Sequence, residues 1–470
     1  MAPLSTMKRL VMLLAVIVLE QSCRKQFLDA KPSSTLVVPT TLSQLQALLD
    51  NTGVFGLVPT LGEASADNYW FPNDYWNGLD PREKNAYVWA PDIFTGQGGQ
   101  LDWNIPYQQV YYANIVLDGL SALQNNPDSI SQLRSLKGSA FFLRAFAFYN
   151  VAQLFAPPYD SARDNSYGIP LRLHADVTVP SKRSTVWQTY QQIINDLDSA
   201  AFFLPATLPN NYRNRPNWLA GQAMLARVYL SMRDYRSARA AADAALQLYS
   251  TLIDYNTLSL TKGVPIITLN PETLYQATFL NSTNQQTGNF FSVLAGGFYA
   301  NTRIDTSLIQ SYEWNDLRRL VYYHYKSPDS SYLKGSYTGN NYPFGGLATD
   351  ELYLIRAEGA ARAADAASAI ADINTLLRNR WKTDSFPGYV VSSAQEALDT
   401  VLLERRKELA FRGLRWTDLR RLNAEGYKIT LTRKLSDSTY ILTPNSNLYT
   451  LPIPPDVIKL SGMPQNQRRP

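Results

Sequence analysis

The spacing of small and aromatic residues between positions 225 and 246 constrains the fold more than any other feature of the chain. Small residues stand at Ala226, Ala238 and Ala245, and Tyr229 and Tyr235 lie between them. Small side chains let two helices approach closely, and aromatic rings fill the space between successive turns. The pattern therefore predicts a helical hairpin over residues 216–249.

This spacing matches the tetratricopeptide repeat, a helix-turn-helix unit of about 34 residues. Arg233 stands where the repeat usually has glycine at its turn, and residues 353–373 form a weaker second unit. Such a unit cannot bury its apolar face alone, so neighbouring units must stack. We expect a mostly α fold, in which about four helical pairs form a scaffold and a loop-rich subdomain packs on one side.

Further helices are predicted where apolar residues recur every three or four positions between capping residues and prolines. They cover residues 41–50, 105–123, 131–155, 184–204, 349–362, 366–381, 393–412 and 415–424. Residues 53–103 and 250–347 are expected to be irregular, and residues 440–470 to be Pro-rich and extended. Loops on a rigid scaffold are where binding residues concentrate.

The N-terminus has the features of a lipoprotein signal. Lys8 and Arg9 precede ten apolar residues, 10–19, a run too short to span a bilayer as a mature helix. The single cysteine, Cys23, follows this run and excludes an internal disulfide. We expect residues 1–22 to be cleaved and Cys23 to carry the lipid; an ordinary signal peptide with an incidental cysteine is the alternative.

Aromatic residues are abundant, with 29 Tyr, 18 Phe and 9 Trp, and many of them stand in polar stretches. Sugar rings pack on Trp and Tyr, while Asp and Asn bind hydroxyl groups. Two stretches, 64–78 and 298–314, combine these residue types. The predicted ligand contacts are Asp67, Asn68, Tyr69, Trp70, Trp76, Tyr299 and Trp314. A local core, or an interface with a partner protein, is the alternative interpretation.

Residues 404–422, ERRKELAFRGLRWTDLRRL, are strongly charged. On one helix Glu408 and Arg412 would pair at a spacing of four residues. Arginine side chains can also bind carboxylates and main-chain carbonyls at the same time. We interpret this segment as structural, joining stacked helices, and not as a ligand site.

Several functional classes find no support. The net charge of +5 is small and scattered, which argues against nucleic-acid binding. There are two histidines, His174 and His324, and no phosphate loop, nucleophile elbow, HExxH or CxxC motif. We therefore predict no catalytic residue, no metal and no cofactor. A glycoside hydrolase stays open as an alternative, because its carboxylate pair is set by geometry and not by spacing.

Several strings, in their order along the chain, resemble the SusD/RagB family of outer-membrane nutrient-binding lipoproteins. They are CRKQFLDAKP from Cys23, FFLRAFAFYNVAQLF (141–155), ELYLIRAEGAAR (351–362), ERRKELAFRGLRWTDLRRL (404–422) and LPIPPDVIKL (451–460). The resemblance covers essentially all of residues 23–470. It implies one body, with an N-terminal part over about 23–250, a loop-rich insertion over about 250–347 and a C-terminal helical part with an extended tail over about 348–470.

The resemblance also implies a function. It indicates a binding protein and not an enzyme, lipid-anchored at the outer membrane and facing the cell exterior. Its partner would be a SusC-like TonB-dependent transporter, and its ligand an oligosaccharide. The same scaffold binding a peptide or another nutrient is the first alternative, and a surface polysaccharide hydrolase is the second. Arg24 and Lys25 stand where family members often have acidic residues. The sequence therefore departs from the family's signal for surface export, although lipidation of Cys23 is still expected.

Overall fold

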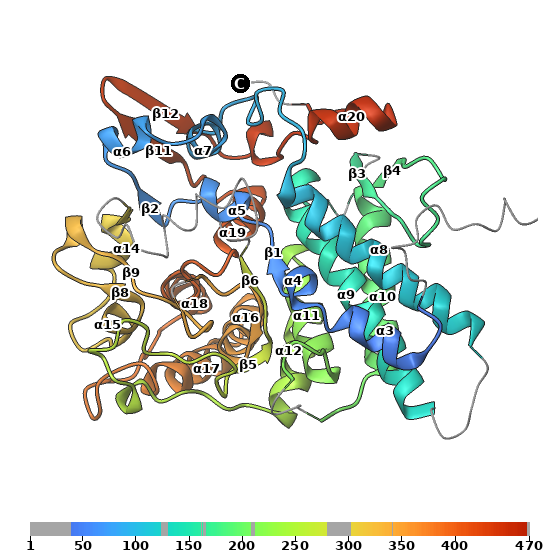
Figure 1. Ribbon diagram of the computed structural model, residues 1–470. Coiled ribbons are helices and arrows are strands. Elements are labelled where there is room, and N and C mark those ends of the chain that lie inside the picture. The colour runs from blue at the N-terminus through green and yellow to red at the C-terminus, as the bar shows by residue number, and fades with distance from the viewer. Residues whose placement is uncertain are drawn as a thin grey trace, which may run out of the picture.

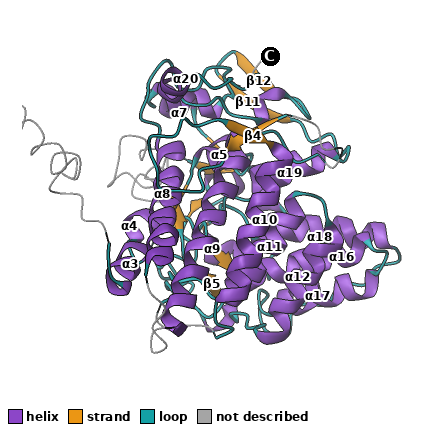
Figure 2. Ribbon diagram, turned by 90° about the vertical axis from the view of Figure 1, so that its right-hand side faces the viewer, coloured by secondary structure: helices purple, strands orange, loops and turns teal. Residues whose placement is uncertain are grey.

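The computed structural model describes residues 39–123, 130–160, 162, 166–207, 212–279, 302–340 and 342–467. The described chain is mostly helical, and its strands are short and lie between or beyond the helices (Figure 2). This confirms the predicted fold class. No helix in this part of the chain is both long and apolar enough to cross a membrane. Cys23 and the expected signal peptide lie outside the described residues.

Eight helices form the scaffold, and each packs against the next in the series. They are α8 (Leu101–Ala122), α9 (Ile130–Phe155), α10 (Val186–Phe203), α11 (Trp218–Ser231), α12 (Tyr235–Leu248), α16 (Thr349–Arg362), α17 (Ala366–Arg378) and α18 (Ala394–Glu408). The series runs from α8, α9 and α10 on the right of Figure 1 to α16, α17 and α18 at the lower left. Eight helices in series correspond to the four pairs expected.

The hairpins α11–α12 and α16–α17 share one turn geometry. Arg233 and Ala364, at equivalent places in the two turns, adopt left-handed backbone conformations with φ of 64° and 61°. Each is followed by an aspartate, Asp234 or Asp365, whose side chain accepts a hydrogen bond from a main-chain N–H in the first turn of the next helix. Arg233 therefore takes the conformation for which the repeat usually uses glycine.

Capping residues fix where several helices begin. Thr185 accepts a hydrogen bond from the Gln188 main-chain N–H, and the Gln188 side chain accepts one from Thr185 in return. Thr41 and Gln44 form the same capping box at the start of α3 (Leu42–Leu49). These caps explain why the helices predicted over residues 41–50 and 184–204 begin where they do. Helix α8 begins at Leu101, four residues earlier than predicted.

The stretch 53–103 is more ordered than the sequence suggested. It holds β1 (Leu57–Val58), β2 (Tyr69–Trp70) and the short helices α5 (Leu61–Ser65), α6 (Asn73–Asn77) and α7 (Pro81–Tyr87), after α4 (Thr52–Phe55). Local caps explain this order. At α7, Asp80 and Glu83 form a capping box, and Pro81 occupies the first helical position.

The remaining elements are short and lie between or beyond the scaffold helices. They are β3 (Tyr167–Pro170), β4 (Arg183–Thr185), η2 (Tyr255–Thr257), β5 (Thr273–Tyr275), β6 (Thr278–Phe279), β7 (Arg303–Ile304), α14 (Thr306–Gln310), α15 (Arg318–Tyr322), β8 (Tyr323–His324), η3 (Pro328–Ser330), β9 (Tyr332–Leu333), β10 (Leu347–Ala348), α19 (Arg415–Ala424), β11 (Leu431–Leu435), β12 (Ser438–Leu442), η4 (Asn447–Tyr449) and α20 (Pro455–Ser461). The tail is thus less extended than predicted, since it contains part of a hairpin, β11–β12, and the helix α20.

Charged side chains of residues 404–422 join elements that lie far apart in the sequence, as expected. Glu408 accepts hydrogen bonds from Arg318 and Arg380, and both guanidinium groups are fully buried. The predicted pair of Glu408 with Arg412 is wrong. Helix α18 ends at Glu408, and Arg412 turns away to form an ion pair of 3.0 Å with Asp350.

Candidate functional site

Two short strands bring together the two aromatic stretches that the sequence singled out. Strand β2 pairs antiparallel with β7, so that Tyr69 lies opposite Ile304 and Trp70 lies opposite Arg303. More than 200 residues separate the two strands in the sequence. The register of this pair places Trp70 and Arg303 on the same face of the strand pair.

A second strand pair adjoins the first one. The main-chain N–H of Ile304 donates a hydrogen bond of 2.9 Å to the carbonyl of Ser331, immediately before β9. Strand β9 pairs in turn with β8, which places Tyr332 opposite His324. The β8 and β9 labels lie beside α14, below β2, in Figure 1. The structure therefore has two separate two-stranded sheets, β2–β7 and β8–β9, joined by this main-chain hydrogen bond.

Side chains alternate between the two faces of each strand pair, as they do along any strand. In each pair one set of side chains belongs to the buried core: Tyr69, Ile304, Leu333 and Tyr323. The other set is half-buried: Trp70, Arg303, Tyr332 and His324. We call these four side chains the ring platform.

The ring platform offers flat rings and hydrogen-bond donors. The His324 and Tyr332 rings are stacked, with centroids 4.7 Å apart and an interplanar angle of 28°. Burial lowers the pKa of His324, and the nearby Lys334 and Lys326 lower it further, so the imidazole is neutral at neutral pH. Ring faces beside polar groups are what the C–H faces and hydroxyl groups of a sugar require.

Trp314 forms a second aromatic feature close by in the sequence. Its side chain is 77 % exposed, and its ring centroid lies 4.5 Å from the guanidinium of Arg319. The other neighbour of Arg319 is Tyr325, also at 4.5 Å, which directly follows His324 at the end of β8. The cation between two rings holds Trp314 in place while its indole remains accessible.

Two predicted contact residues are buried. The Tyr69 hydroxyl donates a hydrogen bond of 2.6 Å to the carbonyl of Ala64, and the Asn68 amide donates one of 2.8 Å to Glu63. The strand alternation that turns Trp70 outward turns Tyr69 inward. Burial argues against direct ligand contact by Asn68 and Tyr69, and we leave both out of the proposed site.

The Asp67 carboxylate forms ion pairs with two arginines. Its two carboxylate oxygens accept hydrogen bonds of 2.7 and 2.8 Å from Arg415, and Arg406 lies 3.4 Å away. Burial opposes ionisation of this carboxyl, but the two guanidinium groups outweigh it and hold the pKa of Asp67 below its usual range. A carboxylate held in this way is a structural group and a poor candidate for binding sugar hydroxyls.

Two predicted residues remain to be placed. Trp76 lies on α6, half-buried, with the Lys84 ammonium 5.5 Å from its ring centroid. Its indole nitrogen is buried and has no hydrogen-bond partner in the described part of the chain. Trp76 therefore stays a predicted contact. Tyr299 lies outside the described residues.

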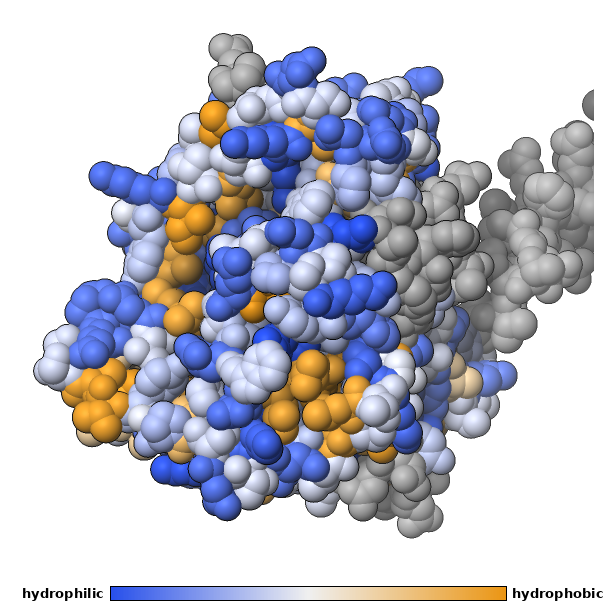
Figure 3. Space-filling view, turned by 90° about the vertical axis from the view of Figure 1, so that its left-hand side faces the viewer, coloured by the Kyte–Doolittle hydropathy of each residue, from blue (hydrophilic) through white to orange (hydrophobic). Residues whose placement is uncertain are grey.

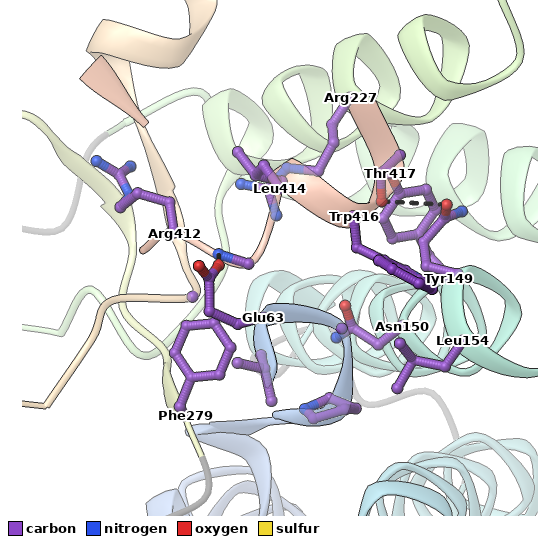
Figure 4. Close-up of a pocket in the computed structure, with 16 residues that line it drawn as sticks. Glu63, Tyr149, Asn150, Leu154, Arg227, Phe279, Arg412, Leu414, Trp416 and Thr417 are labelled. Carbon is purple, nitrogen blue, oxygen red and sulfur yellow. Dashed lines mark hydrogen bonds between the residues drawn. The ribbon is translucent and has the colours of Figure 1, made fainter. Parts of the chain in front are cut away.

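An enclosed cavity lies deeper in the molecule, between α5, α9 and the segment that leads into α19 (Figure 4). Glu63 points across it towards the main chain at Gly413, whose N–H donates a hydrogen bond of 3.0 Å to the carboxylate. The cavity measures about 40 Å³, which has room for a few water molecules and not for a sugar ring. This cavity is therefore too small to hold a saccharide.

Figure 3 looks at the side of the molecule that lies on the left of Figure 1, where β2, β8 and β9 are drawn. Apolar side chains on this side form separate clusters among polar ones, and they do not merge into one large apolar patch. A mixed surface of this kind suits a polar ligand with apolar faces.

Two family models match the chain. One, described as starch-binding and associating with the outer membrane, matches residues 26–230. The other, the SusD family, matches residues 274–467. No curated protein matches the chain in sequence.

Solved structures share the whole architecture. A putative sugar-binding protein from Bacteroides vulgatus is 20 % identical, with a TM-score of 0.71, and the match covers 92 % of this chain and 99 % of that one. A SusD superfamily protein from the same species is 21 % identical, with a TM-score of 0.71 and coverages of 92 % and 100 %. Another SusD superfamily protein, from Bacteroides fragilis, is 19 % identical, with a TM-score of 0.72 and coverages of 91 % and 99 %. At these identities the likeness is one of fold.

Proposed function

The chain belongs to the SusD/RagB family, and from that premise we propose that it captures an oligosaccharide at the outer membrane without altering it. It then delivers the ligand to a SusC-like TonB-dependent transporter. The observation that carries the proposal is the ring platform, where the half-buried Trp70 and Arg303 of one strand pair lie near the stacked rings of Tyr332 and His324 in the adjoining pair. The family model for residues 26–230 and a sugar-binding structural neighbour support the choice of a saccharide.

The platform suits binding better than catalysis. Its members are a neutral imidazole, a phenol, an indole and a guanidinium, and none of them is a carboxyl group. Glycoside hydrolysis needs two carboxyl groups on either side of the scissile bond. Release of new reducing ends from a polysaccharide, lost when one carboxyl group is removed, would establish the hydrolase alternative instead.

The test is calorimetric titration of the purified chain with a panel of neutral oligosaccharides and peptides. We expect at least one oligosaccharide to bind, and Trp70→Ala and Tyr332→Ala each to weaken it about tenfold by removing a stacking ring. The matched control is Phe202→Ala, because Phe202 is a 66 % exposed ring on α10, which lies on the other side of Figure 1. Binding of peptides with no binding of any oligosaccharide would reject the carbohydrate ligand.

The membrane anchor and the transporter need their own measurements. We propose that Cys23 carries the lipid and that the protein faces the cell exterior. Cys23→Ala is then expected to move the protein out of the outer-membrane fraction, and protease added to whole cells is expected to degrade the wild-type protein. Co-purification of the lipidated protein with a TonB-dependent transporter from the same cells would support delivery; a lipidated protein that never co-purifies with such a transporter would count against it.

A further inference from the structure

A groove of about 500 Å³ opens at the C-terminal end of α9, between the start of β3, helix α19 and the last described residues of the chain. We call it the tail groove. Strand β3 lies at the upper right of Figure 1, whereas β2, β8 and β9 lie on the left, so the tail groove is separate from the ring platform. Its volume falls within the range of roughly 300 to 1,000 Å³ that is usual for small-ligand sites.

The tail groove contains a buried cation without a counter-charge. Arg420 lines it and is only 4 % exposed. Its two terminal nitrogens donate to the main-chain carbonyls of Gln153 and Ala156, at the end of α9, but its Nε is buried with no hydrogen-bond partner among the described residues. None of the described lining residues is acidic. A buried guanidinium that lacks an acidic partner favours an anionic ligand.

A second arginine supports one wall of the groove. Arg183 donates hydrogen bonds to the carbonyl of Gly168 and, at 2.7 Å, to the side-chain oxygen of Asn466. It too has no acidic partner in the described part of the chain, and burial lowers the pKa of both Arg183 and Arg420 to about 10. The Arg183 guanidinium lies 5.2 Å from the ring centroid of Tyr167, which lines the groove and is 52 % exposed. Arg183 therefore holds an accessible ring at the edge of a positively charged groove.

The lining also offers groups that bind hydroxyls. The side chains of Asn447 and Gln467 are exposed and have no hydrogen-bond partner among the described residues. Each amide provides two donor hydrogens and one acceptor oxygen. The combination of an unpaired buried cation, an accessible ring and free amides matches a hydroxyl-rich ring that carries an anionic group.

We propose that the tail groove is a second binding site, which takes an acidic saccharide. The anionic group binds at Arg420, the sugar ring packs on Tyr167, and the hydroxyl groups bind the amides of Asn447 and Gln467. The choice of a saccharide over a simple organic acid rests on the proposed function. A uronate carboxylate and a sulfate ester share the required charge; we commit to the uronate, because a planar carboxylate matches the planar edge of a guanidinium.

The experiment is calorimetric titration of the full-length chain with a galacturonic acid trimer, a neutral trimer of the same linkage and a sulfated neutral trimer. We expect the uronate trimer to bind, and its affinity to fall as salt is added. Tyr167→Ala and Asn447→Ala should each weaken it about fivefold to tenfold. Arg420→Lys, which keeps the charge and loses the planar fork, should weaken it further. Arg420 also binds main-chain carbonyls at the end of α9, so the thermal unfolding of the Arg420→Lys variant is measured beside that of the wild type.

Tyr212→Ala is the matched control. Tyr212 is 56 % exposed and lies 4.7 Å from the guanidinium of Arg215, which repeats the Tyr167–Arg183 arrangement away from the tail groove. Its replacement should leave uronate affinity unchanged, and Tyr167→Ala should leave the affinity for neutral glycans unchanged.

Three outcomes overturn the proposal. They are no uronate binding by a protein that still binds neutral glycans, uronate binding that survives Tyr167→Ala and Asn447→Ala, and binding of the sulfated trimer in preference to the uronate. The first outcome leaves the proposed function intact, because the ring platform is tested separately by Trp70→Ala. Failure of every saccharide to bind would refute the proposed function itself.

Discussion

Arg415 and Asp67 form an ion pair across 348 residues of sequence, with two parallel hydrogen bonds of 2.7 and 2.8 Å. The pair ties α19 to the loop between α5 and β2, directly before the strand that carries Trp70. An arginine of the charged C-terminal segment therefore positions the aromatic segment that we assign to ligand binding. The charged segment 404–422 and the aromatic segment 64–78 are therefore in direct contact, although they lie far apart in the sequence.

Removing Arg415 should destabilise the fold. The substitution Arg415→Ala leaves the mostly buried Asp67 carboxylate with only the longer contact to Arg406, and we expect it to lower the free energy of unfolding by about 2 to 4 kcal/mol. Urea unfolding followed by circular dichroism measures this change.

The matched control for that substitution is Arg215→Ala. Arg215 binds Asp50 through two hydrogen bonds of 2.7 and 2.6 Å, but its side chain is 41 % exposed whereas that of Arg415 is 11 % exposed. An exposed pair contributes less than about 1 kcal/mol. Equal losses from both substitutions would contradict the structural role given to Arg415.

The scaffold could be predicted from the sequence because its signals are local. The periodic apolar residues and the caps at Thr41 and Thr185 act within one or two helical turns. The turn at Arg233 was identified by the residues on either side of it, although arginine is unusual there. Helix ends such as that of α18 were placed less well, because they depend on tertiary partners of the last turn.

The ring platform could be predicted only in part. Trp70 stood out because it lies among other aromatic and polar residues, but Tyr332 and His324 reach the platform only through strand pairs of two residues each. Two-residue strands leave no periodic signal, and their register is set by packing. For the same reason the sequence could not show that Tyr69 faces inward while its neighbour faces outward.

Close approach of α12 and α16 gives a second prediction. A Cβ atom added at Gly359 would lie 2.6 Å from the Cβ of Arg239, so Gly359→Ala must push the two repeat units apart. We expect it to lower the free energy of unfolding by about 1 to 3 kcal/mol.

Gly221→Ala on α11 is the control, since a Cβ there meets no atom of the described residues within 4 Å. It should stabilise the protein by about 0.5 to 1 kcal/mol through helix propensity. A neutral or stabilising Gly359→Ala would mean that the units can separate at little cost.

Trp314 gives a prediction that separates binding from stability. Its indole is 77 % exposed, so Trp314→Ala should change the free energy of unfolding by less than about 0.5 kcal/mol. If Trp314 extends the ring platform, the same substitution should weaken binding of the oligosaccharide found in the panel about threefold to tenfold. Unchanged affinity, with unchanged stability, would remove Trp314 from the site.

Stability should also depend on pH through Glu83, which stands at the third position of α7. Burial raises the pKa of Glu83 from 4.5 to about 7, although the N–H of Asp80 partly offsets it, and its Oε1 has no hydrogen-bond partner in the described part of the chain. Between these two pKa values the folded state binds more protons than the unfolded state. The free energy of unfolding must therefore fall as pH rises from about 4.5 to 7 and level off above that, and one such group contributes roughly 3 kcal/mol of the fall. Glu83→Gln keeps an oxygen for the capping box but cannot ionise, so it should remove that part of the slope.

Glu396 is the matched control, because it stands at the same position of α18, fully exposed, and hydrogen bonds from Ser392 lower the pKa of its carboxyl. Glu396→Gln should leave the fall between pH 5 and 8 intact. Urea unfolding at pH 5, 6, 7 and 8 distinguishes the variants, and equal slopes for Glu83→Gln and the wild type would show that Glu83 ionises normally in the folded protein.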